Sequence, residues 1–309
     1  SFIPRAGEGC MWILVTGASG LIGSVLVPFL EERGHTAQRF VRREPGSGAE
    51  VFWDPEAGRI DASAVEGADA VVHLAGKNLA DGRWTPALKK QFLASRVQGT
   101  HLVAMAAAKA KNPPRAVLSA SAIGYYGHCG NARITEQAHA GDDFLARLCA
   151  DWEAASQPAA EAGVRVARLR IGIVLSPGGG ALAQMLPVFR LGLGGPLGSG
   201  RQFMSWIHIR DIAGAILHII ETPSVQGPVN LVSPNPVTNL ELTRALGRAL
   251  RRPALLPAPA PALRLAFGEM ADAALLSSAR VFPEKLLQSG YEFVFTDLDA
   301  ALRDLLPRG

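Results

Sequence analysis

Residues 12–23 read WILVTGASGLIG, an apolar run that leads directly into three glycines at three-residue spacing. Helical periodicity follows to residue 33, and Gly34 marks the end of that helix. A glycine loop between a strand and a helix is typical of pyrophosphate binding, because the tight turn and the close approach of the main chain both need glycine. The helix N-terminus adds unpaired N–H groups and a positive dipole end. The contacts predicted from this loop are Gly17, Ser19, Gly20, Leu21, Ile22 and Gly23. The alternative is that these glycines only form a turn.

Downstream, predicted strands and helices alternate. Strands are expected at 36–41, 69–75, 116–119, 164–175 and 206–209. Helices are expected at 84–111, 142–163, 181–191, 211–221 and 240–250. The tail is expected to be partly helical, with one strand at 291–295. This alternation predicts an α/β fold, a Rossmann-type doubly wound parallel sheet with a smaller C-terminal substrate lobe.

Changes in composition along the chain suggest domain boundaries. Residues 1–10 are interpreted as an upstream extension or tag remnant, because Met11 directly precedes the first strand. Residues 11–176 are expected to form the dinucleotide-binding domain, completed by residues 206–232. A glycine-rich insertion at 177–205 and the tail at 233–309 are expected to form the C-terminal lobe.

Composition excludes several classes of protein. Hydrophobic residues make up 48% of the chain and charged residues 19%, which is typical of a globular protein. The net charge is +4 without a block of like charges, so no nucleic-acid partner is expected, although a small anionic substrate would fit. Three widely spaced cysteines and no metal-binding histidine motif indicate a reducing compartment and no metal site. We expect a cytoplasmic monomer or homodimer with no membrane partner, because no long apolar run or signal peptide occurs.

The end of the second strand indicates which dinucleotide binds. An acidic residue there would bind the ribose 2′-hydroxyl of NAD, whereas an arginine accommodates the 2′-phosphate of NADP. This strand ends in Val41-Arg42-Arg43, with no acid before Glu44. The sequence therefore favours NADP, with Arg42 as the expected contact. The alternative is that both arginines are solvated.

Further segments resemble the extended, epimerase-like branch of the short-chain dehydrogenase/reductase superfamily. They are His73-Leu74-Ala75-Gly76, residues 95–100 (SRVQGT) and residues 206–213 (WIHIRDIA). Residues 124–127 (GYYG) and 189–206 resemble one subgroup, the NADP-dependent "epimerase family" proteins with a small distinctive C-terminal domain. The resemblance implies a seven-stranded parallel sheet that binds NADP. It also implies cofactor contacts from Leu74, Ala75, Gly76, Gln91, Arg96 and Ile173.

The chain departs from that superfamily at its catalytic pair. The usual chemistry needs a tyrosine as general acid/base and a lysine four residues later, which lowers the pKa of the phenol. Here Leu145 stands where the tyrosine belongs and Cys149 where the lysine belongs, and no Tyr-x-x-x-Lys occurs anywhere. The usual proton relay is therefore absent.

Three other residues are candidates for the missing chemistry. Ser121 matches the position of the superfamily's catalytic serine, and Tyr125 and Tyr126 follow it at the carboxyl end of the same strand. Either tyrosine could act as the acid/base if the nicotinamide ring or Arg170 lowered the pKa of its phenol. The alternatives are that both tyrosines pack beside the nicotinamide and that Ser121 only caps a turn.

Several reactive side chains carry less weight. Cys149 lies on an apolar helix, where a buried and inert thiol is the simpler interpretation. His73 is interpreted as structural, and so is His208, with a hydrogen bond expected beside Asp211. Arg170, Arg190 and Arg201 could meet an anionic substrate near the glycine-rich loop at 192–200, although solvated arginines are the default.

The sequence thus leads to two hypotheses. The first is an NADP-dependent oxidoreductase or epimerase-like enzyme for a small substrate, in which hydride moves between the nicotinamide and a substrate carbon. The second is a non-catalytic NADP(H)-binding regulatory protein, which the missing Tyr-x-x-x-Lys pair motivates.

Overall fold

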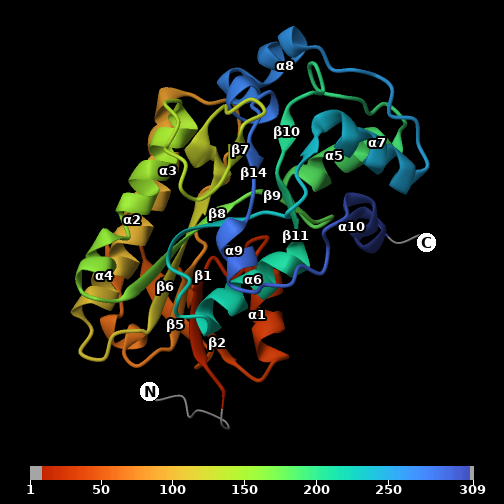
Figure 1. The fold of residues 1–309 in the computed structure, drawn as a ribbon. Helices are drawn as coiled ribbons and strands as arrows, with labels where there is room; N and C mark the ends of the chain where they lie inside the picture. Colours follow the sequence, from red (N-terminus) through yellow and green to blue (C-terminus); the bar gives the residue numbers. More distant parts are fainter. Residues whose placement is uncertain (1–8, 307–309) are drawn as a thin grey trace.

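The computed structural model describes residues 9–306. The molecule is organised around a central β-sheet (Figure 1). Its eight strands run in the order β12 (Gly227–Leu231), β8 (Arg165–Ile171), β6 (Ala116–Ala122), β5 (Ala70–His73), β1 (Trp12–Thr16), β2 (Thr36–Val41), β3 (Glu50–Asp54) and β4 (Arg59–Ile60). Every neighbouring pair is parallel except β3 and β4. The predicted Rossmann-type fold is therefore confirmed.

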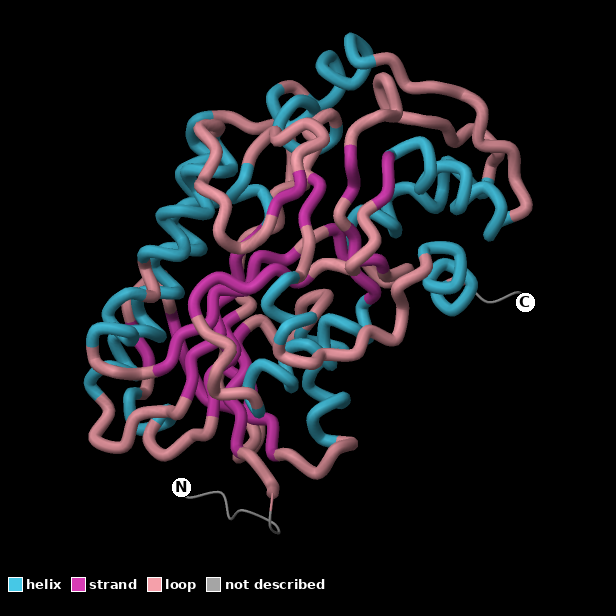
Figure 2. The backbone as a smooth tube through the Cα atoms, viewed as in Figure 1, coloured by secondary structure: helices cyan, strands magenta, loops and turns pink. Residues whose placement is uncertain are grey.

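Helices cover both faces of this sheet, with the strands between them (Figure 2). The two faces are separated by alternation along each strand: Ile13 and Val15 of β1 point to one side and Leu14 to the other. The first side packs against α1 (Gly23–Glu31), α6 (Ile209–Glu221) and α9 (Glu284–Gln288). The second packs against α2 (Pro86–Lys109) and α4 (Gln157–Glu161), and α3 (Phe144–Ala154) lies beside α2.

A smaller lobe lies beyond the carboxyl ends of the strands. It contains α5 (Gly180–Arg190), α7 (Asn239–Leu250), α8 (Ala260–Phe267), a π turn at Ala271–Leu275 and α10 (Leu298–Leu305). Three short strand pairs connect it to the rest: β9 (Ile173–Leu175) with β11 (Trp206–His208), β10 (Phe203–Met204) with β13 (Val237–Thr238), and β7 (Arg133–Ile134) with β14 (Arg280–Val281). Its core is built from α5, α7 and α10 around buried Trp206.

The structure corrects several expected elements. The sheet has eight strands and one antiparallel pair, not seven parallel strands, because the β3–β4 hairpin extends its edge. The expected helix at 142–163 is two helices separated at residues 155–156, ahead of Pro158. The expected strand at 164–175 breaks at Gly172, after which β9 pairs with β11. Residues 291–295 form no strand.

The structure does not test the expectations for residues 1–10 and for the domain boundaries. The interpretation of residues 1–10 falls mostly outside the described residues, and the domain boundaries remain predictions. Between Gly9 and Leu306, no helix combines the length and apolar character needed to cross a bilayer.

Candidate functional site

The glycine loop at residues 17–23 forms one wall of a cleft of about 1380 Å³ at the carboxyl edge of β1, β2 and β5. Gly17 has φ +67°, and a Cβ on it would lie 2.9 Å from the main-chain N of Ala75. A Cβ on Gly23 would lie 2.3 Å from the carbonyl O of Gly17, so the loop and α1 approach closely only because both residues are glycines. The loop therefore has the tight geometry that the sequence predicted.

The start of α1 offers hydrogen-bond donors to this cleft. The amides of Leu21 and Ile22 have no acceptor within residues 9–306, and no side chain caps the helix. Unpaired N–H groups and the positive end of a helix favour an anion. The loop therefore fits a pyrophosphate, since its glycines allow the tight turn against residues 74–75 and the amides at the start of α1 are left without acceptors.

Most of the predicted cofactor contacts line this cleft. They are Gly17, Ser19, Gly20, Arg42, Leu74, Ala75, Gly76 and Gln91. Leu21, Ile22 and Gly23 lie behind the loop at the beginning of α1. Ile173 is placed in β9, paired with Trp206, and does not line the cleft. The cleft also includes residues not anticipated from sequence, notably Trp53 from β3 and Gln98 from α2.

The two arginines after β2 differ in their partners. Arg43 donates to both carboxylate oxygens of Glu50, at 2.9 and 2.5 Å, and this hydrogen bond holds the pKa of the Glu50 carboxyl below its usual value. Arg42 is exposed at the mouth of the cleft and has no acidic partner in the described chain. Of the two, only Arg42 is therefore free to meet a phosphate.

Arg96 lies behind the cleft as a buried cation. Its side chain lies 3.6 Å from where a Cβ on Gly76 would be, and its guanidinium stacks 4.9 Å from the ring of Trp152. Its Nη1 donates a hydrogen bond to the carbonyl O of Phe92 at 3.3 Å, and no carboxylate within residues 9–306 pairs with it. Burial lowers the pKa of this guanidinium. A buried guanidinium without a counter-ion favours an anionic ligand nearby.

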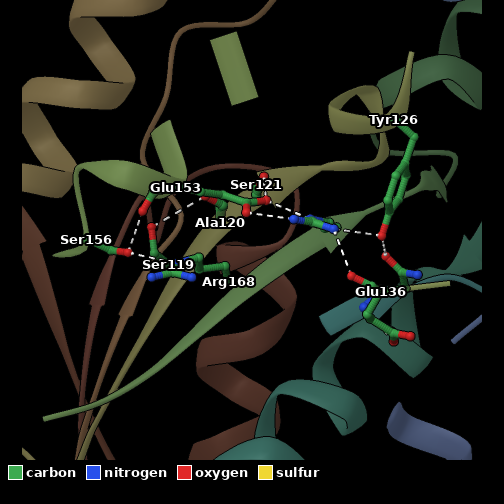
Figure 3. Close-up of polar contacts among 10 residues, drawn as sticks. Ser119, Ala120, Ser121, Tyr126, Glu136, Glu153, Ser156 and Arg168 are labelled. Atoms are coloured by element: carbon green, nitrogen blue, oxygen red, sulfur yellow. Dashed lines mark hydrogen bonds and ion pairs between the residues drawn. The ribbon is translucent and has the colours of Figure 1, made fainter. Parts of the chain in front are cut away.

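Deeper in the molecule, a buried polar network joins the ends of β6, β8 and β12 (Figure 3). Ser121 donates its hydroxyl hydrogen to Glu153 at 2.8 Å. Glu153 also accepts two hydrogen bonds from Arg170, at 2.8 and 2.9 Å, which makes a bidentate ion pair inside the protein. Ser121 is only 2% exposed, so its hydroxyl is engaged by protein and cannot donate to a substrate in this arrangement.

The same network uses both hydrogen-bonding functions of Tyr126. Its phenol donates to Asn230 Oδ1 at 2.7 Å and accepts from Arg170 Nη1 at 2.9 Å. Burial raises the pKa of this phenol to about 12, even though Arg170 acts in the opposite direction. The expected lowering of a tyrosine pKa by Arg170 is therefore outweighed at Tyr126, whose hydroxyl serves the network.

Tyr125 is arranged differently. Its ring stacks edge-on against Tyr126, with centroids 5.4 Å apart, and the Arg170 guanidinium lies 3.5 Å from its ring centroid. The side chain is half-buried, and its hydroxyl has no hydrogen-bond partner in the described chain. The chain has three tyrosines, and the third, Tyr291, donates to the carbonyl of Asp211 at 2.8 Å. Tyr125 is thus the one tyrosine with a free phenol.

Two buried side chains occupy the positions of the missing catalytic pair: Leu145 packs among apolar neighbours, whereas Cys149 lies beside Ser121. Leu145 and Cys149 of α3 face the turn at residues 123–126, where a Cβ on Gly124 would lie 3.3 Å from Leu145 Cβ and 3.8 Å from the Cys149 sulfur. Leu145 packs with Trp84 and Phe92, and Met270 of the small lobe closes over this cluster. Burial raises the pKa of the Cys149 thiol to about 12, in keeping with an inert residue.

The remaining candidates do not line the cleft, although His73 directly precedes Leu74, which does. His73 is buried with Nδ1 2.7 Å from the Thr16 hydroxyl. His208 stacks on Phe295, and its Nε2 lies 3.2 Å from Asp304, so its acidic neighbour is Asp304 and not Asp211 as expected. Arg170 is engaged by Glu153, whereas Arg190 and Arg201 are exposed.

Sequence reasoning missed Glu153, Glu136 and Asn230 as members of the network. Glu136 accepts from the backbone N–H of Asn230 at 3.1 Å, and burial raises the pKa of its carboxyl. One signal was present: β8 reads RVARLRI, with Arg165 and Arg170 inside a strand that the sheet buries. A charged side chain in such a strand needs polar partners from elsewhere in the chain, and Arg170 finds one in Glu153, whereas Arg165 donates to backbone carbonyls of residues 219–225. Within residues 9–306, no three His, Cys, Asp or Glu side chains gather closely enough to hold a metal ion.

Comparison with known proteins gives a consistent picture. A family model described as "NAD dependent epimerase/dehydratase family" matches residues 13–232, and "Domain of unknown function (DUF1731)" matches residues 258–305. An "Epimerase family protein" of Mycobacterium tuberculosis is 45% identical, covering 94% of this chain and 96% of that protein. A crystal structure of human epimerase family protein SDR39U1 with NADPH superposes with a TM-score of 0.88 at 38% identity, covering 96% of this chain and 99% of that one. A nucleoside-diphosphate sugar epimerase structure from Corynebacterium glutamicum gives 0.80 at 35% identity, covering 96% of this chain and 58% of that one.

Proposed function

Because this chain belongs to the NAD dependent epimerase/dehydratase family, we propose that it is an NADP(H)-dependent oxidoreductase or epimerase-like enzyme for a small substrate. The observation that carries this proposal is the free phenol of Tyr125, which follows the carboxyl end of β6, while the neighbouring strand β5 leads directly into residues that line the cleft. The cofactor would supply hydride at the nicotinamide, and the protein would supply orientation and a proton.

The cofactor assignment is supported by the fit of the cleft. The unpaired amides at the start of α1 would hold the pyrophosphate, and the unpaired Arg42 would hold a 2′-phosphate. The related human protein, whose crystal structure contains NADPH, is similar over nearly the whole chain. Arg96 would add a positive charge close to Gly76, on the side of the cleft that leads to α3.

Tyr125 would give a proton to the substrate oxygen, or take one from it, as hydride moves between the nicotinamide and the substrate carbon. Arg170 holds its ring in place and is itself fixed by Glu153. Ser121 would then act as a positioning residue, because its hydroxyl hydrogen is given to Glu153 and not to a substrate.

The experiment is turnover of NADPH, followed by absorbance at 340 nm against a panel of carbonyl compounds. We expect Tyr125→Phe to abolish turnover while NADPH affinity is unchanged, since the phenol touches no protein group. Tyr126→Phe is the matched control, because it removes a hydroxyl bound to Asn230 and Arg170 and should lower stability instead. Equal activity in wild type and Tyr125→Phe would exclude Tyr125 as the acid/base.

A second function, a non-catalytic NADP(H)-binding regulator, is favoured by one observation. The position of the family's catalytic tyrosine is buried among apolar side chains, that of its lysine holds the buried Cys149, and the serine is engaged by Glu153. This alternative predicts tight NADPH binding, no oxidation with any carbonyl compound, and no effect of Tyr125→Phe on any measured property of the cofactor complex.

A further inference from the structure

Four arginines line an open hollow of about 330 Å³ at the C-terminal end of α7. Figure 1 shows this helix at the outer edge of the small lobe. The lining consists of Arg244, Gly247, Arg248, Arg251, Arg252, Ala254 and Leu255. None of these residues lines the dinucleotide cleft. The hollow is therefore a second concave surface, separate from the site described above, and nothing in the proposed function uses it.

The charge of this hollow is not balanced by the protein. Arg248 makes a bidentate ion pair with Asp299 of α10, at 2.9 and 2.8 Å. The other three arginines have no acidic partner within residues 9–306. Arg244 and Arg248 stand four residues apart on one helix face, a spacing at which like charges repel. The C-terminal end of a helix carries roughly half an elementary negative charge. One cation is enough to balance it, so the remaining positive charge needs another explanation.

The main chain at the end of α7 holds one of these arginines in an unfavourable conformation. Arg251 has φ +53° and ψ +43°, and it is the one non-glycine residue in the described part of the chain with a positive φ. Helices commonly end in glycine at such a position, because a Cβ there is strained. A strained conformation at an arginine, where glycine would relieve it, points to a requirement for the guanidinium.

A glycine closes the other wall of the hollow. A Cβ on Gly247 would lie 2.9 Å from Ala254 Cβ and 3.0 Å from the Arg252 carbonyl O. The chain can therefore fold directly back against α7, with the Arg252 amide donating to the Gly247 carbonyl at 3.0 Å. This turn brings Arg252 and Leu255 beside the arginines of the helix.

We propose that this hollow binds an anion that carries two or more phosphate groups. Guanidinium groups pair with phosphate oxygens through two parallel hydrogen bonds, and several neighbouring arginines suit a ligand with several phosphates. Arg248 is held in place by Asp299, so part of the site is already ordered before a ligand arrives. Such phosphates can belong to a soluble polyphosphate or to the headgroup of an anionic lipid. Leu255, which is 80% exposed at the rim, would contact only the second.

The test uses inorganic tripolyphosphate as the probe, titrated calorimetrically into the full-length protein saturated with NADPH, so that the dinucleotide cleft is already filled. We expect one binding site, weakened about tenfold by Arg251→Gly, as is typical for loss of one charge-assisted contact. Because glycine suits the positive φ, this variant should melt at the same temperature as wild type or higher. Its NADPH affinity should not change.

Lys109→Gln is the matched control, since Lys109 is also an exposed cation in the last turn of a helix, α2. It should bind tripolyphosphate like wild type.

A parallel flotation experiment uses vesicles of phosphatidylcholine with and without 30% phosphatidylinositol phosphate, on the order of the charge needed for headgroup recognition. Binding that Leu255→Ser weakens only in the vesicle arm would assign the phosphates to a lipid. Binding in the soluble arm alone would assign them to a free polyphosphate. If neither probe binds, or if Arg251→Gly binds both as wild type does, the proposal is wrong.

Discussion

Arg42 and Arg43 are neighbours in sequence, and the sequence alone gives little reason to separate them. The structure separates them by partner: Arg43 is held by Glu50, and Arg42 is free at the mouth of the cleft. Arg42 was already the contact expected from the sequence, and the physical reason to prefer it over Arg43 is an ion pair that only the folded β2–β3 edge creates. Glu50 could not be anticipated, because β3 was not expected.

Reversing the charge of Arg42 tests the cofactor assignment. We expect Arg42→Asp to weaken NADPH binding by about 1–3 kcal/mol, the scale of losing a charge-assisted hydrogen bond. Fluorescence titration with NADPH and with NADH measures this directly. NADH binding should hardly change, because NADH has no 2′-phosphate. An equal loss for both dinucleotides would show that Arg42 does not recognise that phosphate.

The buried pair of Glu153 and Arg170 should dominate stability at this site. We expect Glu153→Gln to lower the free energy of unfolding by about 3–5 kcal/mol, because it leaves the Arg170 guanidinium buried without a counter-charge. Urea denaturation measures the loss. Glu153→Gln combined with Arg170→Met should recover much of it, since the uncompensated charge is then removed. If the double variant were no more stable than Glu153→Gln, the ion pair would not be the cause.

At the scale of elements, the sequence was sufficient to predict the helices and loops whose formation depends on the spacing of neighbouring residues. The glycine loop, the start of α1 and the amphipathic α6 follow from spacing of a few residues. Elements that depend on distant partners were missed or misjudged. β3 and β4 pair with each other at the sheet edge, and β12 is a strand because β8 lies beside it. The buried polar network around Arg170 was missed for the same reason, since its members come from separate strands and helices.

Residues 291–295 show how a distant partner overrides propensity. Their aromatic and β-branched composition suggests a strand, but the last two amides of the segment are taken by one carboxylate. Asp211, in the first turn of α6, accepts from Val294 N–H at 2.7 Å and from Phe295 N–H at 2.9 Å. Tyr291 also reaches the Asp211 carbonyl. The segment therefore follows the start of α6 and pairs with no strand.

Asp211→Asn should release this segment. An amide oxygen can accept from one of the two N–H groups, but its NH₂ would face the other, so we expect a loss of about 2–3 kcal/mol in unfolding free energy. Hydrogen exchange should show faster exchange at residues 294 and 295 than in wild type. Asp297→Asn is a suitable control, because Asp297 is an exposed N-cap of α10 and asparagine caps helices equally well. Unchanged exchange at 294–295 in Asp211→Asn would contradict the assigned contact.

At the scale of the whole molecule, two buried histidines should link stability to pH. Burial lowers the pKa of His73 and of His208 to about 4, below the ordinary value of 6.5. At His208, Asp304 acts in the opposite direction and Arg210 in the same direction, but burial has the largest effect. The unfolded chain therefore binds protons between about pH 6.5 and pH 4 that the folded chain does not. Stability is complete above the unfolded pKa and falls as pH falls through this window, by up to about 1.4 kcal/mol per pH unit for each histidine.

Carboxylates also titrate near the lower end of that window. The contribution of His208 is therefore measured as the difference between wild type and a variant without this histidine. The backbone N–H of Arg210 donates to His208 Nδ1 at 3.1 Å. In His208→Asn the amide oxygen can accept this hydrogen bond, but the side chain cannot take up a proton. Urea denaturation at pH 7, 6, 5 and 4.5 should then show that the unfolding free energy falls less steeply with pH in His208→Asn than in wild type. Below pH 6 the difference between the two slopes should approach about 1.4 kcal/mol per pH unit, the slope produced by the uptake of one proton. His139→Asn changes an exposed histidine and should follow the wild-type curve. Parallel curves for wild type and His208→Asn would mean that His208 takes up its proton equally in the folded and unfolded chain, and that its stacking on Phe295 does not exclude the charge.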